Sequence, residues 1–293
     1  MEYKSYAKFK EEVVDKHLAQ YNFWEQGIWP GNKSSYRPGN KSSYPHIVAI
    51  PGKTQIEIVK AIIENDGCKF VPELFPSPHK YAHHLNSSQV VCYEFFKPYV
   101  DYIAEKSCTI TKPEVVGLLD KMGFDRAFAQ QFLPGFAEFE WIPDKTENTN
   151  FDFYLHSSDS KKKIYFEIKY TEQGFGTCRN DEDHKIKFDT IYKDMIEKCA
   201  CLSNKPTVFD EEWRKNYQLF RNVLRITKDN WENEYVVFLF PKMNKAAKAH
   251  FERFKAEYID PDYGEHIKEV FWEDLTEYMI IDQFRQKFFF YAL

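Results

Sequence analysis

The chain has little that would suggest a membrane or a secreted protein. No apolar run in its 293 residues approaches the about 18 residues of a membrane span, and the first residues, MEYKSYAKFKEEVV, are too charged for a signal peptide. CxxC pairs are also missing, and the spacing of Cys199 and Cys201 is weak support for structural zinc. We therefore expect a cytoplasmic protein with no membrane span and with reduced thiols.

An excess of basic residues is missing too. The 40 basic and 45 acidic residues give a net charge of −5. This balance is weak evidence against binding to nucleic acid, because the charge along a binding groove matters more than the total. Local basic clusters do occur, at 161–163 and within 242–255. The 27 Phe and 19 Tyr residues can supply the core of one large α/β domain with an added helical part, or of two small domains.

The most informative stretch is 151–170, FDFYLHSSDSKKKIYFEIKY. Two runs of alternating polarity flank a turn-prone segment, which predicts an antiparallel hairpin centred on 159–160. That register creates two cross-strand pairs: Asp152 opposite Glu167 and Tyr154 opposite Tyr165. It also creates one apolar face, formed by Phe151, Phe153, Leu155, Ile164, Phe166 and Ile168.

Asp152, Glu167 and Lys169 are then expected on the opposite, polar face of the hairpin. An upstream alternating run, FAEFEWIP at 136–143, predicts a third strand with Phe139 and Trp141 on one face. Its other face brings Glu140 near Asp152. Carboxylates this close need a cation to neutralise them, and a few carboxylates with water and phosphate oxygens suit Mg²⁺. Acidic residues two positions before a lysine are common in so charged a chain, so an ordinary solvated strand stays an alternative.

This order of elements resembles the PD-(D/E)XK superfamily of restriction-endonuclease-like nucleases, and in detail a bacterial family of predicted restriction endonucleases. Four stretches carry the resemblance: HLNSSQVVCYEFFKPY (84–99), EFEW (138–141), FEIKYTEQGFG (166–176) and YQLFRN (217–222). In one departure, Phe151 stands where the superfamily often has proline.

The resemblance implies an α/β fold with a restriction-endonuclease-like core, in which helices flank a mixed central sheet. Residues 86–293 would form the nuclease-like catalytic domain, and 1–85 an added N-terminal helical and loop region. The implied activity is Mg²⁺-dependent hydrolysis of phosphodiester bonds in double-stranded DNA, by a restriction-type endodeoxyribonuclease that forms a homodimer. The alternative is a catalytically silent nucleic-acid-binding or interaction module on the same fold.

The resemblance also implies residue roles. Asp152 and Glu167 would bind Mg²⁺, or Mn²⁺ in its place, together with the backbone carbonyl of Ile168. Lys169 would orient the attacking water and offset charge at the scissile phosphate. Five further residues would support the site: Glu140, Glu172, Gln173, Gln218 and Arg221.

Several supporting assignments have a structural alternative. Glu172 and Gln173 could be loop residues that cap the next segment. Gln218 and Arg221 share a face of the helix expected at 211–224, and this face could be solvated. Glu94, in a helix that begins after the capping signal Asn-Ser-Ser at 86–88, is the acidic candidate from the helix before the first strand, but we expect it to face solvent.

Outside the hairpin, the pattern predicts a buried strand at 235–241 parallel to an existing strand, a helix at 243–258, a strand at 266–275 and a C-terminal amphipathic helix. Residues 4–27 look helical. A tandem repeat, PGNKSSYR and PGNKSSYP at 30–45, predicts a loop. Its basic and tyrosine residues are candidate DNA contacts, whereas a lengthened surface loop is the favoured explanation.

Overall fold

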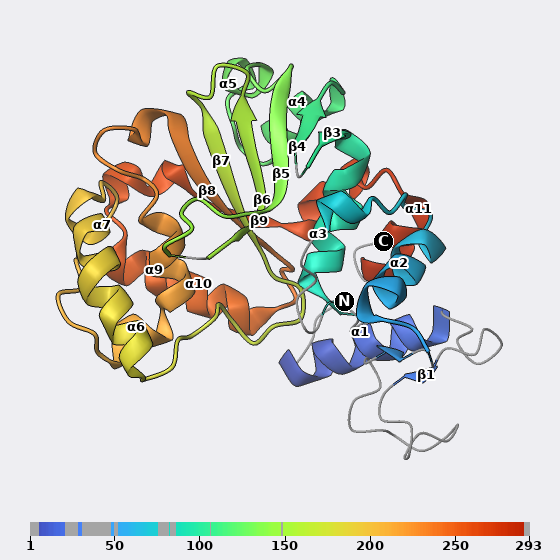
Figure 1. The fold of residues 1–293 in the computed structure, drawn as a ribbon, viewed down its shortest axis with the longest axis horizontal. Helices are drawn as coiled ribbons and strands as arrows, with labels where there is room; N and C mark the ends of the chain where they lie inside the picture. The colour runs from blue at the N-terminus through green and yellow to red at the C-terminus, as the bar shows by residue number, and fades with distance from the viewer. Residues whose placement is uncertain are drawn as a thin grey trace.

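A seven-stranded mixed sheet forms the centre of the computed structural model, with helices on both faces (Figure 1). The structure describes residues 6–20, 29–30, 48–49, 52–75, 82, 86–105, 107–147 and 149–289. The strands follow the order β3-β4-β5-β6-β7-β8-β9, with these bounds: β3 Asp101–Ala104, β4 Ser107–Ile110, β5 Gly135–Trp141, β6 Phe151–Ser157, β7 Lys163–Ile168, β8 Glu234–Phe240 and β9 Ile267–Phe271. This arrangement confirms the predicted fold class.

The strands from β3 to β7 pair antiparallel, whereas β7, β8 and β9 pair parallel. Parallel neighbours need crossover connections, and helices supply them here. The helices have these bounds: α1 Tyr6–Gln20, α2 Gln55–Asn65, α3 Ser88–Phe96, α4 Glu114–Lys121, α5 Arg126–Gln130, α6 Glu182–Lys187, α7 Lys193–Lys198, α8 Glu211–Lys215, α9 Tyr217–Val223, α10 Lys245–Tyr258 and α11 Asp282–Phe288. The parallel strand predicted at 235–241 and the helix predicted at 243–258 are confirmed as β8 and α10. The strand predicted at 266–275 is confirmed only as far as Phe271, where β9 ends and a 3-10 helix, Trp272–Tyr278, begins.

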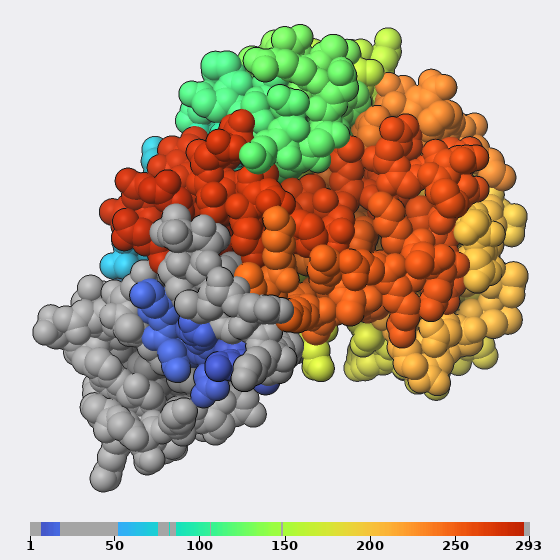
Figure 2. Space-filling view, turned by 180° about the vertical axis from the view of Figure 1, so that it is seen from behind, coloured from blue at the N-terminus to red at the C-terminus, as the bar shows by residue number. Residues whose placement is uncertain are grey.

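Two hydrophobic clusters cover the two faces of the sheet. The first joins α1–α5 and α11 to one face, and the second joins α7–α10 to the other (Figure 1). Seen from behind, the segments from β8 onward form much of the surface (Figure 2). Because helices cover both faces, β8 is buried along most of its length, which explains its nearly continuous apolar sequence.

The hairpin register is as predicted, since Tyr154 lies opposite Tyr165 and the ladder continues to Phe153 and Phe166. The prediction that Phe151 shares a face with Phe153 is wrong, as is the matching prediction for Trp141 and Phe139. Phe153 and Phe139 belong to the cluster with α3, whereas Phe151 and Trp141 pack with Tyr154 on the opposite face.

The cause of this change of face lies in β5. Glu140 has φ of 51°, in the left-handed region, so the strand loses its alternation between Phe139 and Trp141. Phe151 remains paired with Trp141 and turns to the same face. The ends of β5 and β6 are therefore twisted where Glu140 and Asp152 face each other.

The described N-terminal helices share the core of the sheet domain. Phe9 and Val13 of α1 and Ile62 of α2 belong to the cluster that includes Phe166 of β7. In addition, α1 packs against α11 and α2 against α3. The division at residue 85 stays a prediction, and the tandem repeat lies outside the described residues apart from Pro30. None of the described helices combines the length and apolar character that a membrane crossing requires.

Candidate active site

Asp152 lies against the end of β7 rather than projecting freely from β6. The backbone N–H of Ile168 donates a hydrogen bond of 2.6 Å to Asp152 Oδ2. The hairpin ladder, which ends at the pair Phe153 and Phe166, places Asp152 next to Glu167. The structure thus brings together the three residues for which a metal-binding role was predicted.

Glu167 and Lys169 form a buried ion pair. Lys169 Nζ lies 2.6 Å from Glu167 Oε1. Lys169 is 8% exposed and Glu167 is 1% exposed. Burial alone would lower the pKa of Lys169, but the charge of Glu167, followed by those of Asp152 and Glu172, raises it overall. These two side chains do not belong to a solvated strand, which was the alternative explanation of the pattern.

Helix α9 supplies the other partners of Glu167. Asn222 Nδ2 donates to Glu167 Oε2 at 2.7 Å, and the Arg221 guanidinium lies 3.5 Å from the same oxygen. Arg221 also donates to the carbonyl of Asn150 at 3.1 Å. Both α9 residues are buried, so the alternative of a solvated face does not hold for this part of the helix. The helix expected at 211–224 is in fact two, α8 and α9, joined at Asn216.

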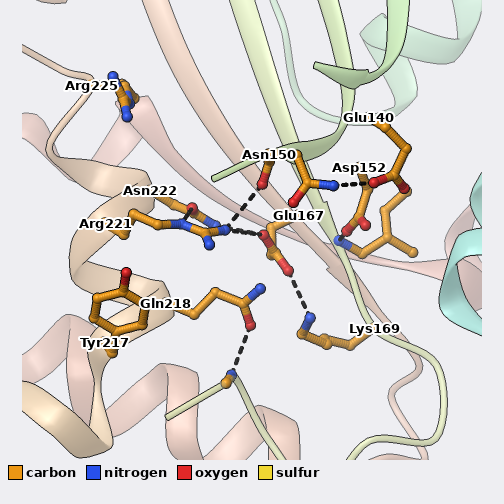
Figure 3. A network of polar contacts seen from close by, with 12 residues as sticks. Glu140, Asn150, Asp152, Glu167, Lys169, Tyr217, Gln218, Arg221, Asn222 and Arg225 are labelled. Carbon is orange, nitrogen blue, oxygen red and sulfur yellow. Dashed lines mark hydrogen bonds and ion pairs between the residues drawn. The ribbon is translucent and has the colours of Figure 1, made fainter. Parts of the chain in front are cut away.

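Glu140 completes the acidic side of the site. It lies across from Asp152, between the pairs Phe139–Phe153 and Trp141–Phe151, and its carboxylate accepts a hydrogen bond from the side chain of Asn150. Asn150 therefore links Glu140 to Arg221, and the network runs from β5 through the loop before β6 to α9 and β7 (Figure 3). A non-glycine residue with positive φ is costly, and such strain is typical of functional sites.

Asp152 is the carboxylate whose protonation the site perturbs most clearly. Burial raises the pKa of Asp152 well above its usual range, and the charge of Glu167 raises it further, whereas Lys169 acts in the opposite direction. Among the described residues, no three His, Cys, Asp or Glu side chains are arranged as a complete set of metal ligands. The oxygens of Asp152 and Glu167 are nevertheless the donor type that Mg²⁺ prefers, and a cation would relieve the repulsion between them.

The remaining supporting residues lie in or beside the loop that follows β7. Glu172 accepts a 2.6 Å hydrogen bond from the backbone N–H of Tyr170, so its side chain caps the strand end. Gln173 is exposed and lies outside this network. Gln218 points toward the site, and its Oε1 accepts a 2.7 Å hydrogen bond from the N–H of Gly176 (Figure 3).

Sequence reasoning gave no role to Asn222 or Asn150. Asn222 stands four positions after Gln218, and this spacing was a signal that both residues face the site. The expectation that Glu94 faces solvent is wrong, since Glu94 is 1% exposed and lies near Asp66 and Lys287 rather than Glu167. Burial, followed by the charge of Asp66, raises the pKa of Glu94 well above its usual range.

Comparisons with known proteins identify the family of the chain. No curated protein matches the chain, and no solved structure does. A family model described as "Restriction Endonuclease associating with ARP" matches residues 76–289, which include every strand of the central sheet and α3 to α11. The match covers well over half of the 293 residues. The chain therefore belongs to this restriction endonuclease family.

Proposed function

We propose that the protein is a metal-dependent endodeoxyribonuclease of the restriction type, which hydrolyses phosphodiester bonds of double-stranded DNA at the Asp152–Glu167–Lys169 site. One observation carries the proposal: a buried lysine lies 2.6 Å from a buried glutamate, and Asp152 of the neighbouring strand β6 is hydrogen-bonded beside them to the end of β7. Two carboxylates and an amine at one strand end suit a cation, a phosphate and an attacking water.

Asp152 and Glu167 would hold Mg²⁺ through carboxylate oxygens, with the carbonyl of Ile168 as a further ligand. The ion, when bound, supplies a Lewis acid that polarises the phosphate and lowers the pKa of a bound water. Lys169 positions that water and balances charge on the phosphate. Asn222 and Arg221 orient Glu167 from the side of α9, since both contact Glu167 Oε2.

The contacts of Glu167 also define the rival function. Both of its oxygens already have protein partners, because Lys169 lies at Oε1 and Asn222 at Oε2. In a catalytically silent DNA-binding module these partners would be permanent, and no cation would be needed. In the nuclease, Lys169 exchanges part of this contact for water and phosphate.

The deciding experiment incubates the purified protein with unmethylated plasmid and phage DNA, with Mg²⁺ or with EDTA. We expect cleavage with Mg²⁺ alone, and its loss in Asp152→Asn and Lys169→Gln. Lys163→Gln is a matched control, because Lys163 begins the strand β7 that Lys169 follows, and it forms its own 2.6 Å ion pair with the buried Glu234. Binding of Mn²⁺, followed by its paramagnetic resonance spectrum, tests the metal site without relying on activity.

Equal cleavage by Lys163→Gln and wild type, with none by Lys169→Gln, would support the proposal. Cleavage that survives in Lys169→Gln, or DNA binding by wild type with no cleavage in any metal, would favour the silent module. Circular dichroism of each variant confirms that the fold is retained.

A further inference from the structure

A cleft of about 460 Å³ lies beside the proposed catalytic residues. Its lining comes from the loop after β7, the end of α8 and one side of α10: residues 173–177, Lys215, His250 and Arg253. No acidic side chain is among these described lining residues, whereas Lys215 and Arg253 are cationic. The cleft therefore has the character of an anion site.

The cleft is connected to the catalytic network by direct contacts. Gly176 lines the cleft and donates its N–H to Gln218, which points toward Lys169 in Figure 3. Phe175 also lines the cleft, and its ring centroid lies 5.9 Å from Lys169 Nζ. A strand of DNA cut at Lys169 would therefore have a neighbouring phosphate close to this cleft.

His250 fixes the shape of the cleft rather than its charge. Its Nδ1 accepts the N–H of Phe175 at 3.2 Å, so its Nε2 carries the proton that is donated to Asn216 Oδ1 at 3.0 Å. Asn244, at the start of α10, donates to the carbonyls of Tyr170 and Glu172. Both ends of the loop are thus held against α10, and a ligand would meet a preformed wall.

Two glycines let the loop lie close to its neighbours. A Cβ added at Gly174 would lie 2.8 Å from His250 Nδ1, and one at Gly176 would lie 3.0 Å from Gln218 Oε1. Side chains at these positions would push the loop away from α9 and α10. In the Gly-Phe-Gly sequence, the buried Phe175 therefore anchors the loop. The two glycines let the backbone on either side of it lie against α9 and α10.

Arg253 is the cation best placed to take a ligand. Lys215 is already paired with Glu211 at 2.7 Å and with Glu212 at 3.8 Å on its own helix. Arg253 is exposed on α10 and has no carboxylate partner among the described residues. An unpaired guanidinium on a concave surface is suited to the oxygens of a phosphate group.

We propose that this cleft binds a backbone phosphate of the substrate strand next to the scissile phosphate, with Arg253 as the main contact and Lys215 as a weaker one. The inference rests on the proposed nuclease function and adds a named contact to it. Because a phosphate contact reads no base, it positions the strand for Lys169 without setting the recognition sequence.

The test measures binding of a labelled DNA duplex by wild type, Arg253→Ala and Lys215→Ala between 50 and 200 mM salt, with Ca²⁺ in place of Mg²⁺ to hold back cleavage. Arg126→Ala is the matched control, an exposed arginine at the start of α5. Helix α5 lies at the turn of the β6–β7 hairpin, where its Phe128 contacts Lys162. The turn is at the opposite end of β7 from the cleft. Cleavage in Mg²⁺ is measured in parallel.

We expect Arg253→Ala to weaken binding at low salt and to reduce the slope of log K against log salt by about 0.9, the value for one lost phosphate contact. The ratio of wild-type affinity to Arg253→Ala affinity should therefore fall about 3.5-fold between 50 and 200 mM salt. Lys215→Ala should show a smaller change, and Arg126→Ala none.

The possible results separate the two proposals. If wild type cleaves DNA but Arg253→Ala keeps the wild-type slope and affinity, the phosphate contact is wrong and the nuclease function stands. If wild type binds DNA through Arg253 without cleaving it, the cleft stands and the catalytic assignment is wrong. An equal loss in Arg253→Ala and Arg126→Ala would show general charge attraction and would overturn the cleft assignment.

Discussion

Asn222 of α9 donates a 2.7 Å hydrogen bond to Glu167 of β7, between residues 55 positions apart in the chain. Both side chains are buried, at 0% and 1% exposure. The contact therefore fixes the orientation of the carboxylate from the side opposite Lys169. It also makes α9 part of the proposed centre rather than a helix that only covers the sheet.

Replacing Asn222 tests the importance of this contact. Asn222→Ala removes a buried donor to a carboxylate, and we expect a loss of about 1–3 kcal/mol in the free energy of unfolding, measured by urea denaturation. Asn222→Asp should lose more, because it places a second carboxylate at Glu167 Oε2. Gln218→Ala, on the partly exposed part of the same helix, should lose less. Equal stability of Asn222→Ala and wild type would contradict the role given to this contact.

The backbone of Glu140 gives a second prediction. Its φ of 51° suits glycine better than any residue with a Cβ, so Glu140→Gly should be more stable than Glu140→Ala, by about 1 kcal/mol. Glu138 lies in the same strand with regular pairing, and there the order should reverse, with Glu138→Ala more stable than Glu138→Gly. Thermal unfolding of the four variants measures both differences. If the Ala variant is more stable than the Gly variant at both positions, Glu140 is not strained.

His250 makes stability depend on pH. Burial lowers the pKa of His250, and the charge of Arg253 lowers it further. The unfolded chain therefore binds the proton more readily than the folded one, so the contribution of His250 is present above a pH of about 6.5 and is lost as the pH falls below it. Protonation would also abolish the acceptor for the Phe175 N–H. Denaturation curves from pH 5 to 8 should show a weaker acid dependence in His250→Gln than in wild type.

A buried lysine links the N-terminal helices to the C-terminal one. Lys287 of α11 forms an ion pair with Asp66 at the end of α2, close to Glu94 of α3, and all three are at most 3% exposed. Lys287→Met leaves the carboxylates without their cation, and we expect a loss of about 3–5 kcal/mol.

The control for this prediction lies on the same helix. Arg285→Met breaks a pair with the exposed Asp282 and should cost at most about 1 kcal/mol. The double variant Lys287→Met/Asp66→Asn should recover part of the loss, because it also removes a buried charge. A loss in Lys287→Met no larger than in Arg285→Met would contradict the importance of the buried pair.

The hairpin was predictable because alternation acts over a few residues and allows one register in which the apolar rows align. This reasoning placed Asp152 beside Glu167 and Tyr154 opposite Tyr165. It failed at Trp141 and Phe151, because nothing in the side chain of Glu140 signals a left-handed backbone. The surrounding structure imposes the positive φ of Glu140, and a pattern of neighbouring residues carries no information about that structure.

The partners of Glu167 on α9 were less predictable for a different reason. Helical periodicity shows that Gln218 and Asn222 share a face, but it does not show which face lies against the sheet. The hairpin of β3 and β4 and the helices α4 and α5 were not predicted at all. The strands β3 and β4 have four residues each and α5 has five, which is too short for a period to show. Helix α4 does have an apolar face, formed by Val115, Val116, Leu118 and Leu119, and sequence reasoning overlooked it.

The position of β7 between an antiparallel and a parallel neighbour has a consequence for the order of folding. Its contacts with β6 close a short hairpin, which forms in about 1–10 μs, whereas its pairing with β8 joins residues 71 positions apart. We therefore expect Asp152 and Glu167 to meet while still in water, before β8 and α9 have docked. When α9 docks, it removes water from the carboxylates of Asp152 and Glu167, which are already side by side. We therefore expect the dehydration of this site to be among the last steps of folding.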